Sequence, residues 1–178
     1  MRLSSLAALL FGLTALAQGP NRLPLKADLV LSPDFCATKK RQSMAIKDVM
    51  NVGKAACPKL QDKLGAIFSD LSRVDAAPAV GASAAQVILI PKFIDVSSTQ
   101  PLVPSSQRKL VITLEWTIQN SAGRPIWLQT VQGSSQHKLG WIVTTKGVTA
   151  LVDAAIDDLV EESVSRMSSA RELRDLPK

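Results

Sequence analysis

The sequence predicts an α+β domain of two or three layers, in which a mostly antiparallel sheet of about four strands is packed by two long helices. Residues 108–134 alternate apolar and polar side chains on both sides of a turn, which is typical of a β-hairpin. Residues 53–71 and 146–167 repeat apolar side chains at helical spacing. With single strands at 25–31 and 86–96, the predicted order of elements is β-α-β-β-β-α.

The N-terminus has the pattern of a secretory signal peptide over residues 1–17. Arg2 gives a positive start, an apolar run follows, and Ala15-Leu16-Ala17 is a small-residue cleavage pattern. The run is too short for a transmembrane segment. The residue directly after Ala17 is not a Cys, so we expect an exported protein that is periplasmic or associated with the outer membrane and is not lipid-anchored.

The remaining chain is long enough for one domain with a hydrophobic core, since the sequence has 178 residues in all. We expect this domain over residues 25–167 and a charged C-terminal tail over residues 168–178. The formal charge is +6 but scattered, aromatic residues make up only 4%, and Tyr is absent. Modules that stack on bases need aromatic side chains beside basic ones, so we expect no nucleic-acid partner. The charge favours a solubilising surface, or a mild attraction to anionic polymers or lipid surfaces.

The first half of the chain contains the predicted strand at 25–31 and the helix at 53–71. The connection between them carries Lys39-Lys40-Arg41. Pro58 belongs in the first helical turn, where its missing N–H costs nothing.

The two cysteines, Cys36 and Cys57, lie just after the strand and near the helix start. An even pair in an oxidising compartment indicates a disulfide. Two free thiols, a metal pair and a redox pair are the alternatives, although the spacing is not C-x-x-C and no His or further Cys lies near to complete a metal site.

The hairpin has two faces, and its turn decides which residues share each face. Asn120-Ser121-Ala122-Gly123 suits a turn ending in a left-handed Gly, which pairs Asn120 with Arg124. We then expect Ile118 opposite Ile126, Trp116 opposite Leu128 and Leu114 opposite Thr130. A two-residue loop would instead bury Trp127 opposite Trp116. On the preferred register, the second face is covered by a helix or offered to a partner. The binding candidates are Trp127, Val131 and Thr113 of this face, together with Trp141, the third Trp of the chain.

No motif for catalysis, a metal or a cofactor is found. His137 is the sole His and has no companion at metal-ligand spacing. No Gly-rich phosphate loop and no G-x-S-x-G elbow is present. We therefore expect no cofactor, no metal and no enzymatic activity.

Several segments resemble those of small envelope proteins. The strand LVLSP, the helix opening Val52-Gly53-Lys54, the strand VILIPKFIDV and the hairpin segment GRPIWLQTVQG look like the α/β domain of YajG-like and CsgG-like proteins. Lipoprotein activators of penicillin-binding proteins and the N-terminal domain of TolB look similar. The resemblance spans residues 25–167 and implies a non-enzymatic protein that binds other envelope components or assembles into complexes.

Three functions follow as hypotheses. The first is an exported binding or assembly module for an envelope protein or an outer-membrane assembly partner, which can be oligomeric. The second is a carrier of a small apolar or lipid ligand, which needs a sizeable apolar cavity. The third is a hydrolase with a site near His137, which needs a carboxylate and a hydroxyl within hydrogen-bond reach.

Overall fold

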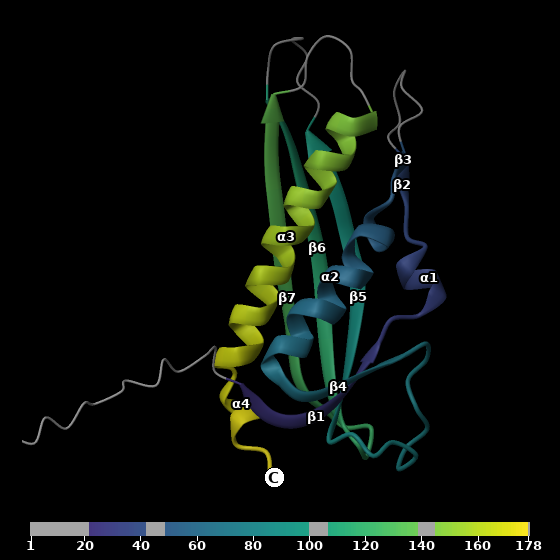
Figure 1. Cartoon of the computed structure of the whole chain (residues 1–178), viewed down its shortest axis with the longest axis vertical. Helices are drawn as coiled ribbons and strands as arrows, with labels where there is room; N and C mark the ends of the chain where they lie inside the picture. Colours follow the sequence, from purple (N-terminus) through teal and green to yellow (C-terminus); the bar gives the residue numbers. More distant parts are fainter. Residues whose placement is uncertain (1–21, 42–48, 100–106, 139–144, 178) are drawn as a thin grey trace, which may run out of the picture.

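The chain forms a five-stranded mixed sheet with both long helices on one face (Figure 1). This computed structural model describes residues 22–41, 49–99, 107–138 and 145–177. The strand order is β4-β1-β5-β6-β7, and the covering helices are α2 (Val52–Ile67) and α3 (Thr145–Ser169). The predicted α+β class is confirmed. The predicted signal peptide lies outside the described residues.

The other elements complete the sheet and its ends. The short helices α1 and α4 flank the two long ones, and β2 pairs with β3 in a separate two-stranded sheet. Their bounds are β1 Leu23–Val30, α1 Pro33–Cys36, β2 Lys40–Arg41, β3 Val49–Met50, β4 Phe68–Val74, β5 Val87–Thr99, β6 Gln107–Asn120, β7 Pro125–Lys138 and α4 Arg171–Arg174. The predicted charged tail contains α4, whose Leu173 is fully buried.

The sheet differs from the predicted four antiparallel strands. It has five strands, and β1 lies between β4 and β5 and pairs in parallel with both. The strand missed was β4, because Phe68 and Leu71 continue the apolar spacing of the helix before them. In the structure α2 ends at Ile67, and Phe68 begins the strand. The result is a parallel β1–α2–β4 crossover, a connection that needs a helix-length segment.

The described residues contain four helices, where the sequence predicted two. Helices α2 and α3 have 16 and 25 residues, while α1 and α4 have four each. Pro58 is inside α2 and not in its first turn, because the helix begins at Val52. The proline N–H that would reach the Lys54 carbonyl is therefore missing.

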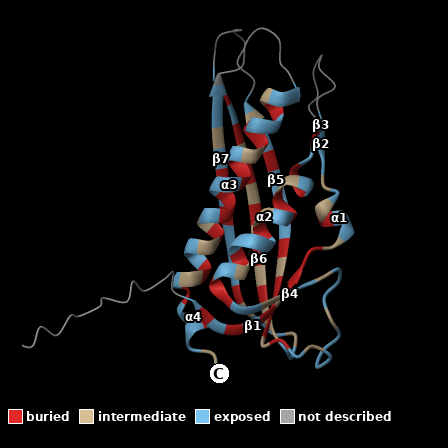
Figure 2. Cartoon of the chain, viewed as in Figure 1, coloured by how far each residue is buried: buried red, intermediate tan, exposed pale blue. Residues whose placement is uncertain are grey.

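The core lies between the sheet and its helices (Figure 2). Strand β6 shows this in its alternation: every second side chain from Arg108 to Ile118 is buried, and those between are half-buried or exposed. The buried set faces α3, while no helix of the described chain covers the opposite face. The domain therefore has two layers.

The predicted turn is confirmed, but the predicted strand register is wrong. Gly123 has φ 74°, and the Asn120 N–H donates to the Arg124 carbonyl at 2.9 Å. Beyond the turn, Gln119 pairs with Pro125 while Ile118 pairs with Trp127, so Ile126 is an extra residue in β7. Such a bulge moves every later side chain to the other face.

This bulge reverses the predicted faces of β7. Trp116 lies opposite Gln129, and Leu114 opposite Val131, in place of Leu128 and Thr130. Trp127 and Val131 thus join the buried layer, whereas Leu128 is 60% exposed. The physical reason is the burial of the larger indole in the hydrophobic core.

Helix α3 crosses β7 at Gly133 with almost no space between the backbones. A Cβ on Gly133 would lie 2.2 Å from the Ala155 carbonyl oxygen and 2.4 Å from the Leu159 nitrogen. The neighbouring Ser134 N–H donates to the Asp158 carboxylate at 2.7 Å. Only glycine allows this approach of helix and strand.

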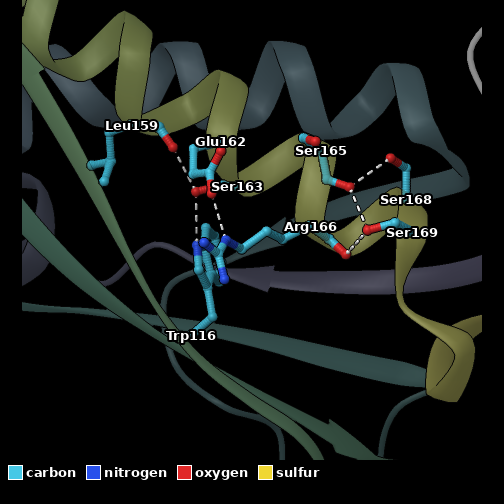
Figure 3. A network of polar contacts seen from close by, with 8 residues as sticks. All are labelled: Trp116, Leu159, Glu162, Ser163, Ser165, Arg166, Ser168 and Ser169. Carbon is cyan, nitrogen blue, oxygen red and sulfur yellow. Dashed lines mark hydrogen bonds and ion pairs between the residues drawn. The ribbon is translucent and has the colours of Figure 1, made fainter.

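A buried hydrogen bond fixes the same helix to β6 (Figure 3). The indole N–H of Trp116 donates to the Ser163 hydroxyl at 3.0 Å, and that hydroxyl donates to the Leu159 carbonyl at 2.7 Å. Both side chains are fully buried. A buried indole N–H needs such a partner, since an unsatisfied donor is costly.

We predict that Ser163→Ala lowers the free energy of unfolding by about 1–3 kcal/mol, because it leaves the Trp116 donor unpaired. Urea denaturation measures the change. The control is Ser165→Ala on the exposed side of α3, which should stay within about 0.5 kcal/mol of wild type. Equal stabilities of the two variants would contradict the role of this bond.

Gly133→Ala should lower the free energy of unfolding by about 3 kcal/mol, because α3 must move away from β7. Gly65→Ala is the control: it lies within α2, and a Cβ there meets nothing within 4 Å. That substitution should stabilise the protein by about 0.5–1 kcal/mol through helix propensity. Thermal denaturation of both variants tests the pair, and a neutral Gly133→Ala would show that the close approach is not needed.

Candidate ligand-binding cleft

Of the four predicted binding residues, the three that the structure describes do not form one surface. Trp127 and Val131 are only 8% and 1% exposed, and both belong to the hydrophobic core. Thr113 is half-buried on the opposite face, where its hydroxyl accepts a hydrogen bond from Gln132 at 3.3 Å. Trp141 lies outside the described residues. The binding surface predicted around Trp127 is therefore wrong, because the bulge places that side chain in the core.

The sheet face without helices carries some apolar surface. Leu128 of β7 lies on it, opposite Thr117 of β6. Ile94, at the register shift in β5, is 49% exposed. Most other residues on this face are polar or half-buried, but Ile88 of β5, opposite Gln119, is buried.

His137 does not have the neighbours that a hydrolase would need. Its side chain is exposed near the end of β7, opposite Arg108. No hydrogen bond or ion pair joins it to a carboxylate or hydroxyl within the part of the chain that the structure describes. The same residues contain no group of three or more His, Cys, Asp or Glu side chains placed to hold a metal ion.

A cleft of about 520 Å³ lies where the first turns of α2 and α3 meet β3. Apolar side chains from all three elements line it, with polar groups among them. Its volume falls within the range of roughly 300 to 1,000 Å³ that is usual for small-molecule sites. The lining residues are Val49, Met50, Asn51, Lys54, Ala55, Thr145, Val148, Thr149, Val152 and Asp153.

The cleft has an apolar inner surface and a polar rim. Met50, Val148 and Val152 are buried beside it, while Thr149 and Lys54 are exposed. Val49 is 41% exposed. Such a surface suits an amphiphile, whose apolar part leaves water and whose polar part stays at the rim.

The charges on the rim are unequal. The carboxylate of Asp153 lies 3.8 Å from the Lys59 ammonium, which also pairs with Asp157 at 2.7 Å and donates to the Asp153 carbonyl at 3.1 Å. Lys54 makes no ion pair with any residue in the described ranges. Lys59 thus offsets part of the negative charge of Asp153 and Asp157, whereas the charge of Lys54 is available to a ligand.

The disulfide between Cys36 and Cys57 supports one wall of the cleft. It joins α1 to α2 with a Cα–Cα distance of 5.8 Å, which confirms the predicted disulfide. The loop that it closes contains β2 and β3, and β3 consists of the lining residues Val49 and Met50. Gly53 packs in the same place: a Cβ there would lie 2.1 Å from the Phe35 carbonyl oxygen.

The cleft residues were not identified from the sequence. Val148 and Val152 look like ordinary core positions of an amphipathic helix, and the short strand β3 has no periodicity to reveal it. The available signal was the basic run Lys39-Lys40-Arg41 within the loop between the cysteines.

Comparison with known proteins places the fold but not the function. No family model matches the sequence, and no protein with a curated description is significantly similar to it. Among solved structures, a protein of the family DUF330 from Xanthomonas campestris has a TM-score of 0.57 at 10% identity, over 85% of this chain and 87% of that one. A hypothetical protein from Chlamydia trachomatis has a TM-score of 0.51 at 10% identity, over 82% and 96%. A minor lipoprotein from Acinetobacter baumannii has 0.48 at 13% identity, over 81% and 90%.

The Xanthomonas and Chlamydia proteins share a fold with the chain at 10% identity. Lipoproteins from Nitrosomonas europaea and Neisseria meningitidis match with lower TM-scores of 0.45 and 0.38. The narrower resemblance to YajG-like, CsgG-like or TolB-like domains is not confirmed.

One prediction about location is overturned by the same comparison. The sequence predicted a protein that is not lipid-anchored, because the residue directly after Ala17 is not a Cys. The structural neighbours are mostly named lipoproteins, which are held to the membrane by their lipid. The prediction of an unanchored protein is therefore withdrawn. Among the described helices, none is long and apolar enough to cross a bilayer.

We predict that the double variant Cys36→Ala/Cys57→Ala lowers the free energy of unfolding by about 3 kcal/mol, because the loop between the cysteines is no longer closed. Chemical denaturation measures this loss, and reduction of the wild-type disulfide should reproduce it. Hydrogen exchange should increase most in β2 and β3. A wild-type protein that reacts with thiol reagents before reduction would contradict the bond.

Proposed function

We propose that the protein is a non-catalytic envelope protein that binds an amphiphilic ligand in the cleft between α2 and α3. The cleft itself carries this proposal, since it combines ligand-sized volume, an apolar inner surface and a polar rim. The predicted signal peptide and the lipoproteins among the structural neighbours support the envelope location.

The geometry favours this function over the binding of a partner protein. Trp127 and Val131, first expected to bind a partner, are buried, and the open sheet face exposes few large apolar side chains. A concave apolar site excludes water from a ligand more fully than a flat face does. Protein binding is the second candidate function, because the large apolar side chains of Leu128 and Ile94 are exposed.

The test measures binding of the apolar fluorescent probe N-phenylnaphthylamine to the purified protein. Thr149→Trp fills the cleft from its rim and should weaken probe binding at least about tenfold, which is about 1.4 kcal/mol. The matched control is Ala154→Trp, which places the same side chain at an exposed position of α3 outside the cleft. The control should bind the probe like wild type.

Two results would contradict the proposal. One is a wild-type protein that does not bind the probe. The other is equal binding by Thr149→Trp and Ala154→Trp. A protein partner held on the open sheet face would be captured by both variants alike, so the same pair separates the two candidates.

A further inference from the structure

The end of the domain that contains the cleft gathers cations from three separate elements. Lys54 lines the cleft in the first turn of α2, and Lys146 stands in the first turn of α3 between lining residues. Lys40 and Arg41 of β2 pair directly with the lining residues Met50 and Val49 of β3. All four side chains are exposed.

The opposing charge at this end is small. Asp153 is the one carboxylate among the described residues that line the cleft, and Lys59, which it shares with Asp157, offsets part of its charge. The starts of α2 and α3 add the positive ends of two helix dipoles. The rim of the apolar cleft is therefore positive overall.

We propose that the amphiphile is an anionic phospholipid, taken up where this end of the domain meets a negatively charged membrane surface. Its acyl chain lies against Met50, Val148 and Val152, and its phosphate is held at the rim by Lys54. Lys40, Arg41 and Lys146 face neighbouring headgroups. This inference rests on the proposed function, because it names the ligand of the same cleft.

Other ligands would fit less of the site. A free phosphate would satisfy Lys54 but leave the apolar lining in water, and a neutral lipid would fill the lining but leave the cations unpaired. The exposed Val49, beside Arg41, adds an apolar side chain to a basic rim. This combination is typical of surfaces that bind anionic membranes, where apolar burial and electrostatic attraction act together.

The experiment measures co-sedimentation of the protein, produced and exported as the full chain, with lipid vesicles. We expect binding to vesicles that contain phosphatidylglycerol and much weaker binding to phosphatidylcholine alone. The triple variant Lys40→Gln/Arg41→Gln/Lys54→Gln should bind the anionic vesicles about a hundredfold more weakly, about fivefold for each cation removed. The control Lys26→Gln/Lys63→Gln/Lys92→Gln removes the same charge from exposed sites elsewhere and should bind nearly as wild type does.

Further measurements distinguish a lipid headgroup from free phosphate, and a failure of the lipid assignment from a failure of the proposed ligand-binding function. Thr149→Trp should also weaken vesicle binding, and inorganic phosphate should compete no better than sodium chloride of equal ionic strength. Equal loss in both triple variants, vesicle binding unchanged in Thr149→Trp, or specific displacement by phosphate would each overturn the lipid assignment. If the triple variant Lys40→Gln/Arg41→Gln/Lys54→Gln still binds N-phenylnaphthylamine as wild type does, the proposed ligand binding in the cleft stands even where the lipid assignment fails. If wild type never binds the probe, the proposed function itself fails.

Discussion

The extra residue in β7, at Ile126, is the constraint on which the rest of the structure depends. It sets which face of β7 meets α3. With it, Trp127, Val131 and Gly133 all lie under the helix, and Gly133 allows the backbones to meet. Without it, Leu128 and Thr130 would face the helix, and the glycine would lie on the open side, where no close approach needs it. The bulge and the glycine are thus two parts of one packing solution.

The position of α3 in turn determines where the cleft can form. Strand β7 runs parallel to β1 and β5, because two antiparallel pairings separate it from β5. Helices α2 and α3 both return against that direction, so they begin at the same end of the sheet (Figure 1). Two helices that start side by side leave space between their first turns, and β3 closes that space. The Lys59–Asp157 ion pair joins the helices just beyond the lining.

Much of the fold could be predicted from local patterns, but the site could not. The alternation in β6 and the turn at Gly123 each depend on a few neighbouring residues, and the pairing of Cys36 with Cys57 follows from the sequence having two cysteines. The structure agrees with all three. The bulge has no local signal, since it is favoured by the burial of Trp127 against a helix that comes later in the chain. The strand β4 was hidden because Phe68 fits the helical spacing of Leu64 and also fits a strand. Features that depend on contacts between distant segments cannot be derived from spacing alone.

The same distinction explains why the cleft was missed while its charge was visible. Each lining residue has an ordinary role in its own element: Val148 and Val152 belong to an apolar helix stripe, and Lys54 to an exposed first turn. Only the shared starting end of α2 and α3 brings them together, and the disulfide closes the loop that contains β3. A ligand site built in this way is sensitive to the covalent closure of one loop. Loss of the Cys36–Cys57 bond would free the wall that carries Val49 and Met50 while leaving the packing at Gly133 and Trp116 in place, because no residue of that loop contributes to either contact.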